Sequence, residues 1–274
     1  MTAAYEAASK GMGRTDVVIE VLDARAPGAS CNPAIEPLRR QAQRPALKVL
    51  NKADLADPER TKRWLRHYNA QPQTRAIAIS SKATGEAGRV PKACMLLAPG
   101  RGTIAKPLRL MILGIPNVGK STLMNTLSRR HLARVGDEPG VTKTPMRHEL
   151  RAGLVLVDTA GLLWPRMTED VALKLAALHS VGAAAYDPET VAASLGDILL
   201  RDYRQALLER FGVAGETQGG HDLLVHVARK RSLLLKGGEA DLRKAAVALL
   251  TDFRSGVLGA ITLEVPPAAP EELA

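Results

Sequence analysis

The sequence predicts an α/β domain, built on a mostly parallel sheet with helices on both faces, followed by a smaller all-helical domain. Short apolar runs alternate with helical patterns over the first 166 residues. Each apolar run ends in polar residues or glycine, and ligands of such sheets bind beyond the carboxyl ends of the strands. From residue 167 onward the apolar residues recur at helical spacing instead. We therefore assign residues 1–166 to the first domain, 167–265 to the helical domain and 266–274 to a disordered tail.

Local patterns place the individual elements. The apolar runs predict strands over residues 17–22, 46–50, 75–79, 108–113 and 154–157. A helix is expected over 58–68, with Asp57 as its N-cap and Pro58 at its first position. Another begins at Lys120 and runs to about residue 130, while glycine and proline make 99–107 a connector. In the second domain, helical spacing covers 171–178, 194–211, 221–235 and 239–253.

Composition excludes several classes of protein. With 274 residues and 46% hydrophobic content, the chain can bury a sizeable core. No apolar run approaches the ~18 residues of a membrane span, and the first residues lack the apolar core of a signal peptide. The two cysteines, Cys31 and Cys94, have neither metal-ligand spacing nor a disulfide framework. We expect a soluble, cytoplasmic protein whose cysteines are packing residues.

The positive charge is confined to the first part of the chain. Residues 1–110 contain 19 Lys and Arg against 9 acids, which accounts for the whole net charge of +10. A basic domain of this kind indicates a polyanionic partner, and nucleic acid is the commonest; the alternative is a generally basic surface without one. Because aromatics make up only 3% of the chain, phosphate contacts and RNA shape are better expectations than base stacking.

A phosphate-binding loop is the clearest motif. Gly114 to Ser121 fits G-x-x-x-x-G-K-[ST], after an apolar strand and at the start of a helix. Glycines let backbone N–H groups converge on phosphate oxygens, and the helix N-terminus adds positive partial charge. Lys120 is expected to reach the β- and γ-phosphates and the Ser121 hydroxyl to bind Mg²⁺. The phosphate-binding residues are then Asn117, Val118, Gly119, Lys120, Ser121 and Thr122.

A second motif, Asp158-Thr-Ala-Gly161, follows an apolar strand 44 residues after Gly114. Asp158 is expected to hold Mg²⁺ through a water, and the Gly161 N–H to meet the γ-phosphate. Between the two motifs lies a loop rich in glycine and proline, in which Thr142 is our choice for a further Mg²⁺ ligand and Thr144 the alternative. We expect Lys120, Thr142 and Gly161 to be the catalytic residues.

The base-reading motif is Asn51-Lys52-Ala53-Asp54. The Asp54 carboxylate can accept hydrogen bonds from N1–H and the 2-amino group of guanine, whereas adenine offers no donor at either place. Asn51 would support the neighbouring loop, and the Lys52 stem would pack over the ring. In Ser80-Ser81-Lys82 the Ser81 backbone N–H would donate to the guanine 6-oxo group. Together these motifs make GTP a far better ligand than ATP.

The order of the motifs is unusual. In an ordinary GTPase the phosphate loop comes first and the base-reading motifs last, whereas here Asn51 and Ser81 precede Gly114. The chain therefore reads as circularly permuted, with 99–107 joining the old ends. As a result, the segment after Gly161 leads directly into the helical domain, and we expect bound GTP to bias that domain.

With this order the chain resembles the ribosome biogenesis GTPase A family, the YlqF-type circularly permuted GTPases. The resemblance extends from residues 16–25 through 114–122 to 158–165 and, more loosely, into the C-terminal helices. It implies a circularly permuted P-loop GTPase domain and a GTPase that supports late maturation of the large ribosomal subunit. It also implies a helical domain that docks on ribosomal RNA, for which Arg229 to Arg231 and Arg243-Lys244 are candidate phosphate contacts.

Two departures bear on catalysis. Many GTPases place a Gln after D-x-x-G to orient the attacking water, but this chain has Leu162, so hydrolysis without assistance should be slow. The family shares this replacement and is thought to use a histidine of an N-terminal Phe-Pro-Gly-His-Met motif, which is absent here. Either the start is truncated or misassigned, with the histidine just upstream of Met1, or the lineage dispenses with it. His131 and His148 flank the predicted switch and are only faint candidates.

The expected ligands and partners follow from these motifs. They are GTP or GDP, Mg²⁺, and the large-subunit precursor with its rRNA, bound by a monomer without membrane contact. Asn117 is a candidate K⁺ ligand, as in related permuted GTPases, or an Asn that tolerates a tight turn. Two other functions remain open: an RNA-binding assembly factor in which the nucleotide is structural, and a small-molecule kinase built on the phosphate loop.

Overall fold

The computed structural model describes residues 2–128, 148–151, 153–161, 164, 166–213, 215 and 217–268, with the backbone alone for 2–4, 148, 151 and 157–161. Two compact units make up this part of the chain. One holds the residues up to Arg166 together with those from Glu264 onward, and the other is Met167–Leu263. Each unit buries its own set of apolar side chains.

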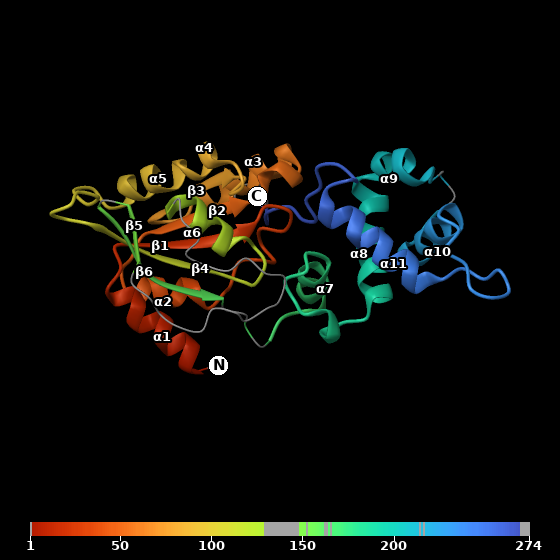
Figure 1. The fold of residues 1–274 in the computed structure, drawn as a ribbon, viewed down its shortest axis with the longest axis horizontal. Helices are drawn as coiled ribbons and strands as arrows, with labels where there is room; N and C mark the ends of the chain where they lie inside the picture. Colours follow the sequence, from red (N-terminus) through yellow and green to blue (C-terminus); the bar gives the residue numbers. More distant parts are fainter. Residues whose placement is uncertain are drawn as a thin grey trace. The chain divides into compact units, whose positions relative to one another are not determined.

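A six-stranded sheet in the order β3-β2-β1-β4-β6-β5 forms the centre of the first unit (Figure 1). All neighbouring strands are parallel except β5 and β6, which pair antiparallel at one edge. Every residue of β1 and β2 is buried, as expected of inner strands covered on both faces. The predicted parallel sheet is thus confirmed. The strands are β1 (Val17–Asp23), β2 (Ala46–Asn51), β3 (Thr74–Ile79), β4 (Leu108–Gly114), β5 (His148–Arg151) and β6 (Leu154–Gly161).

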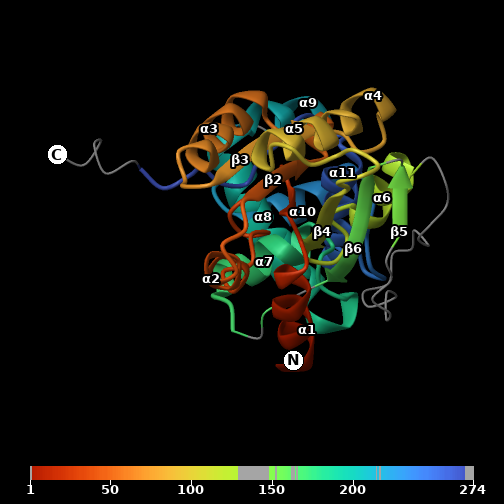
Figure 2. The same cartoon turned by 90° about the vertical axis from the view of Figure 1, so that its left-hand side faces the viewer.

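Helices cover both faces of the sheet. Val18 and Leu22 lie on the same side of β1, since side chains alternate along a strand. Val18 packs with α1 (Thr2–Gly13) and α2 (Ile35–Gln41), and Leu22 packs with α3 (Pro58–Asn69). The opposite face carries α4 (Thr84–Ala87), α5 (Arg89–Leu97) and α6 (Lys120–Ser128) (Figure 2).

The capping predicted for α3 is confirmed. Pro58 occupies the first turn, and the Asp57 carboxylate accepts hydrogen bonds from the N–H groups of Glu59 and Arg60 at 2.8 and 3.1 Å. These bonds satisfy N–H groups that the helix itself leaves without a partner. They fix the start of the helix that follows the base-reading motif.

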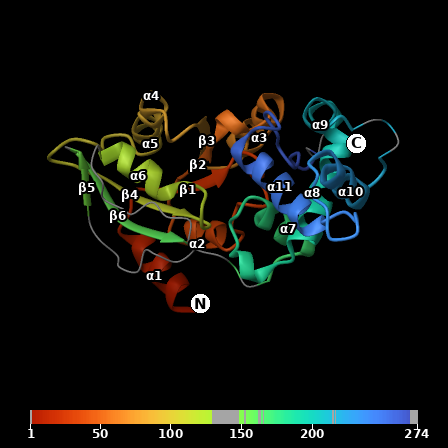
Figure 3. The same cartoon turned by 45° about the vertical axis from the view of Figure 1, so that its right-hand side comes forward.

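The described residues of the second unit form helices and connecting turns, with an isolated β-bridge between Leu234 and Ala240. Its longest helix, α8, contacts each of the other four (Figure 3). The single helix expected over 194–211 is two helices, because the backbone of Tyr203 departs from helical geometry with a φ of −138°. The helices are α7 (Glu169–Ala177), α8 (Pro188–Asp202), α9 (Arg204–Phe211), α10 (Gly220–Lys230) and α11 (Leu242–Ser255), with a short 3-10 turn at Ala183–Ala185 (η2). A similar 3-10 turn in the first unit spans Ala53–Leu55 (η1).

After the helical unit the chain returns to the first unit at Glu264. The Ala29 N–H donates to the Glu264 carboxylate at 2.8 Å, and the Trp64 indole N–H donates to the Glu264 carbonyl oxygen at 3.3 Å. The first unit is therefore made of two separate stretches of sequence. The expected ranges instead place Glu264 in the helical domain, which was assigned residues 167–265. Residues 269–274 of the expected tail lie outside the described residues.

None of the helices in the described part of the chain is long and apolar enough to cross a membrane.

Candidate functional site

Strand register brings the predicted motifs together at the carboxyl ends of the parallel strands. Asp23, Asn51 and Ile79 are neighbours at the ends of β1, β2 and β3, so Ser80 and Ser81 begin beside Asn51. The phosphate loop leaves the sheet at the end of β4, which pairs with β1 and β6. All of these positions are carboxyl ends of parallel strands, where ligands of such sheets bind.

Asn51 joins the base-reading motif to both neighbouring loops. Its side-chain amide donates to the Val118 carbonyl oxygen in the phosphate loop at 2.7 Å. The side-chain amide oxygen of Asn51 accepts a hydrogen bond from the Ser81 N–H at 2.9 Å. Only 1% of Asn51 is exposed, so both bonds are shielded from water. The support role expected of Asn51 corresponds to two specific hydrogen bonds.

Lys52 contacts the phosphate loop as well. Its ammonium donates to the Asn117 carbonyl oxygen at 2.7 Å and to the Asp23 carboxylate at 2.8 Å. Asp23 is fully buried and also pairs with the Arg25 guanidinium through two bonds of 2.9 Å. Although burial alone would raise the pKa of Asp23, the charges of Arg25 and Lys52 hold that pKa well below its usual range. Asp23 is therefore a carboxylate at neutral pH.

Sequence reasoning did not single out Asp23 or Arg25 as site residues. The Asp23-Ala-Arg25 segment follows an apolar strand and belongs to the residues 16–25 that carry part of the family resemblance, and neither of these features predicts a role for its side chains. A usable signal exists, because an acid at the end of one parallel strand lies beside the residue that ends the next strand. Here that neighbour is Asn51, and Lys52 follows it directly.

The phosphate loop has the geometry expected of its glycines. Gly114 and Gly119 have φ values of +149° and +99°, which side-chain-bearing residues rarely adopt. A Cβ on Gly119 would lie 2.2 Å from the Asn51 amide nitrogen, so this position also needs the space. The loop ends at the N-terminus of α6, where backbone N–H groups can receive an anion.

The Lys120 side chain reaches back to the start of the loop. Its ammonium donates to the Ile115 carbonyl oxygen at 2.7 Å. Burial lowers the pKa of Lys120 to about 8. The ammonium is thus still mainly protonated at neutral pH and can attract a phosphate group. Ser121 and Thr122 follow in the first turn of α6, and both are half-buried.

The predicted γ-phosphate and Mg²⁺ residues are described only in part. In the backbone, Gly161 at the end of β6 pairs with Gly114, where the phosphate loop begins. Asp158 pairs with Met111 of β4, and its side chain lies outside the described residues. Thr142, Thr144, His131 and Leu162 lie there too, as does the His148 side chain. A hydroxyl at Ser121 and a carboxylate on the adjacent strand are hard oxygen ligands of the kind that suits Mg²⁺.

The other residues predicted to contact guanine also follow the carboxyl ends of these strands. Asp54 is exposed in η1, and its charge acts on Arg25. Ser80 is buried and its N–H donates to the Glu86 carboxylate at 2.7 Å, while Lys82 is exposed. The Ser81 N–H is taken by Asn51 rather than left open, so a guanine 6-oxo group would have to share or displace that bond.

Asn117 adopts a left-handed backbone conformation with φ +60°. Asn is among the residues that tolerate this region, so the conformation agrees with the tight-turn interpretation. It does not conflict with a K⁺ ligand, because the carbonyl oxygen bound by Lys52 and the side chain are different groups. Both interpretations of Asn117 therefore stay predictions.

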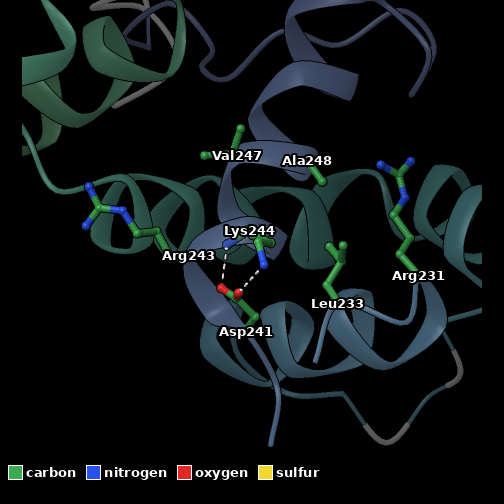
Figure 4. Close-up of a pocket in the computed structure, with 7 residues that line it drawn as sticks. All are labelled: Arg231, Leu233, Asp241, Arg243, Lys244, Val247 and Ala248. Atoms are coloured by element: carbon green, nitrogen blue, oxygen red, sulfur yellow. Dashed lines mark hydrogen bonds and ion pairs between the residues drawn. The ribbon is translucent and has the colours of Figure 1, made fainter. Parts of the chain in front are cut away.

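A separate hollow of about 530 Å³ lies in the helical unit (Figure 4). Leu233, Val247 and Ala248 provide its apolar part, and three basic side chains line it with Asp241. Lys244 is paired with Asp241 at 3.0 Å, and Arg231 with Asp252 at 2.6 Å. The basic residues are Arg231, Arg243 and Lys244.

Comparisons with known proteins show which proteins the chain is similar to. Residues 109–195 match the family model described as 50S ribosome-binding GTPase. Ribosome biogenesis GTPase A of Bacillus cereus is 34% identical over 259 residues, which are 92% of this chain and 86% of that protein. A GNP-bound crystal structure of YlqF from T. maritima has a TM-score of 0.67 at 25% identity, with 97% of this chain and all of that chain covered. A GDP-bound YlqF structure shares the fold with a TM-score of 0.68 at 24% identity, with 96% and 100% covered.

Proposed function

Because the chain belongs to the ribosome biogenesis GTPase A family, we propose that it binds and hydrolyses GTP while it assists late maturation of the large ribosomal subunit. Its affinity for the precursor particle would depend on the bound nucleotide. The observation that carries this proposal is the pair of hydrogen bonds from Asn51, which tie the base-reading motif to the phosphate loop and to Ser81.

The residues of the proposed site would each have a separate role in binding GTP. Asn51 and Lys52 hold the two loops together, and the exposed Asp54 carboxylate would accept hydrogen bonds from the guanine base. The N-terminus of α6 and the Lys120 ammonium supply positive charge for the phosphates. Ser121 and Asp158 would hold Mg²⁺, which neutralises the charge that develops on the phosphates during transfer. Thr142 and Gly161 would close on the γ-phosphate and Lys120 would stabilise its charge.

Nucleotide-dependent binding is supported by chain connectivity. The backbone of β6 ends at Gly161 beside the phosphate loop, and the helical unit begins at Met167. We infer that ordering of the Gly161 segment by GTP changes the affinity of the helical unit for the particle. Arg231, Arg243 and Lys244 are the side chains we propose as contacts to rRNA phosphates.

Phosphate release from GTP, measured with and without large ribosomal subunits, tests the enzymatic part. Slow release by the chain alone and multiple turnovers with large subunits are expected, whereas small subunits should have no effect. Lys120→Ala is the inactive control. Absence of turnover despite tight GTP binding would instead favour an assembly factor in which the nucleotide is structural. The same assay on a chain extended upstream of Met1 would measure what a preceding histidine motif adds.

Binding to large-subunit precursors tests the switch. The chain loaded with a non-hydrolysable GTP analogue should bind more tightly than the GDP form, because a ligand shifts only an equilibrium whose two states it binds unequally. Equal affinities would overturn this part of the proposal. Arg243→Gln combined with Lys244→Gln should weaken binding of both forms.

A K⁺ series against Na⁺ at fixed Mg²⁺ separates the two interpretations of Asn117. If Asn117 helps to hold K⁺, turnover should rise with K⁺ and Asn117→Ala should abolish the rise. Identical turnover in both salts would leave only the turn-forming role.

A further inference from the structure

Two non-glycine residues with left-handed backbones meet at the centre of the site. Lys52 has φ +60° and ψ +34°, and Asn117 has φ +60°. The Lys52 ammonium donates to the Asn117 carbonyl oxygen, so one hydrogen bond joins the two residues. Such conformations cost free energy and persist only where surrounding contacts enforce them. A contact that holds the Lys52 side chain in place would help to enforce this backbone conformation.

Asp23 provides that contact. Its carboxylate accepts at 2.8 Å from the same Lys52 ammonium that donates to Asn117. The carboxylate itself accepts from Nε and Nη2 of the Arg25 guanidinium, and the Asp23 N–H donates to the Ser30 hydroxyl at 3.0 Å. Asp23 is 0% exposed and Arg25 is 2% exposed. The carboxylate is thus a rigid, buried anchor for a lysine whose side chain is itself a quarter exposed.

A flexible lysine stem needs an anchor of this kind. Free rotation about its four-carbon chain would let the ammonium leave the Asn117 carbonyl, and ordering it again would oppose ligand binding. Groups that hold a binding residue in place beforehand remove that cost from the binding step. Because both loops touch any bound guanine nucleotide, the benefit would not depend on the number of phosphates.

We propose that Asp23 is a positioning residue for guanine-nucleotide binding, which fixes Lys52 against Asn117 and so keeps the base-reading loop and the phosphate loop in binding geometry. This inference rests on the proposed GTP binding and assigns a role to a residue that itself touches neither base nor phosphate. Its effect passes through Lys52.

The chain offers a matched control three residues away. Glu20 and Lys48 form another buried carboxylate–lysine pair between the same two strands, with 1% and 3% exposed. Their other partners are the Asn32 N–H and the Cys31 thiol, which lie outside the nucleotide site. Glu20→Gln and Asp23→Asn therefore make the same chemical change at two buried carboxylates of the same strand, and Asp23 is the one linked to the phosphate loop through Lys52.

The experiment measures Kd for GDP and for a GTP analogue by calorimetry on the full chain, together with thermal unfolding. Both variants should unfold at lower temperature. Asp23→Asn should raise both Kd values by a similar factor of roughly 10 to 100, whereas Glu20→Gln should leave them within about twofold of the original chain. Equal Kd values for Asp23→Asn and Glu20→Gln would assign Asp23 a structural role only and overturn the proposal.

A double-mutant cycle shows whether Asp23 acts through Lys52. In a Lys52→Met background, Asp23→Asn should have little further effect on either Kd, and fully additive effects would contradict the proposal. If Asp23→Asn does not fold because Arg25 loses its partner, Asp23→Asn with Arg25→Gln replaces the charge pair by two neutral amides. That variant should fold and still show the increased Kd.

Nucleotide binding by the original chain distinguishes failure of this proposal from failure of the proposed function. If it binds no guanine nucleotide, the function itself fails. If it binds and Asp23→Asn binds equally well, only the role of Asp23 fails.

Discussion

The side-chain amide of Asn51 and the carbonyl oxygen of Val118 are joined by a buried hydrogen bond of 2.7 Å. The bond connects the end of β2 to the phosphate loop, although the two residues are 67 positions apart in the sequence. The second bond of Asn51, from the Ser81 N–H, reaches a third loop. One side chain therefore holds together three segments that a nucleotide would contact.

Asn51→Ala should weaken nucleotide binding much more than it destabilises the fold. The substitution leaves the Val118 carbonyl and the Ser81 N–H without their partner, at a cost of about 1–3 kcal/mol, or roughly a 10- to 100-fold higher Kd if the loops separate. Asn69→Ala is the control, because Asn69 also bonds two backbone groups, Leu65 O and Ala76 N, away from the site. Calorimetric titration with GDP should show the increase for Asn51→Ala alone. Similar Kd values for both variants would contradict the assigned role.

Gly119→Ala should abolish detectable nucleotide binding while the protein remains folded. The added Cβ would lie 2.2 Å from the Asn51 amide nitrogen, so the loop or Asn51 must move. Gly100→Ala is the control: Gly100 also has positive φ, at +81°, but nothing lies within 4 Å of its added Cβ. Both variants carry a backbone penalty of about 1 kcal/mol, which thermal unfolding can measure. Binding of GDP by Gly119→Ala at the original Kd would show that the contact can relax.

The Cys31 thiol should be almost inert in the folded chain. Burial, followed by the negative charge of Glu20, raises its pKa to about 12. Since the thiolate is the reactive form, alkylation of Cys31 at pH 8 should be about 1000-fold slower in the folded than in the unfolded chain. Mass spectrometry after timed iodoacetamide treatment, with a urea-unfolded sample for comparison, measures both rates.

The raised pKa of Cys31 also makes the stability of the fold depend on pH. Between the ordinary thiol pKa and about 12, the folded chain keeps a proton at Cys31 that the unfolded chain has lost. Stability should therefore decrease as the pH rises through this range, and Cys31→Ala should lessen the decrease. Equal alkylation rates in the folded and unfolded states would show that the thiol is accessible and ionised.

Glu264→Ala should destabilise the first unit. The Ala29 N–H, in a residue only 2% exposed, would lose its acceptor, at a cost of about 1–3 kcal/mol. Glu6→Ala, at an exposed position of α1, is the control and should change the free energy of unfolding by less than about 0.5 kcal/mol. Urea unfolding followed by the tryptophan fluorescence of the chain measures the difference. An unchanged midpoint for Glu264→Ala would mean that water replaces the carboxylate.

Much of the sheet could be predicted from the sequence because its strands are continuous apolar runs that end in motif residues. Asn51 and Gly114 lie at the strand ends expected for them. The helices α1 and α5 were not predicted, since their alanine-rich and mixed sequences give weak periodic patterns. Their burial depends on the sheet, which no local pattern reveals.

The site was predictable in its motifs but not in its internal contacts. Sequence patterns indicate which residues meet a nucleotide, because phosphate and base recognition require fixed spacings. The bonds of Asn51 to Val118 and of Lys52 to Asp23 depend on strand register and on a left-handed backbone at Lys52. Those features arise from tertiary packing, and so the role of Asp23 emerged only from the structure.

The contact of Glu264 with Ala29 and Trp64 also has a consequence for synthesis on the ribosome. The chain emerges from its amino end, so the sheet is translated long before the stretch that completes the surface around Trp64. All of Met167–Leu263 must be made in between. Co-translational folding of the nucleotide-binding unit can therefore finish only after the helical unit has been translated, and a fragment that stops at Arg166 would leave the Ala29 N–H without its acceptor.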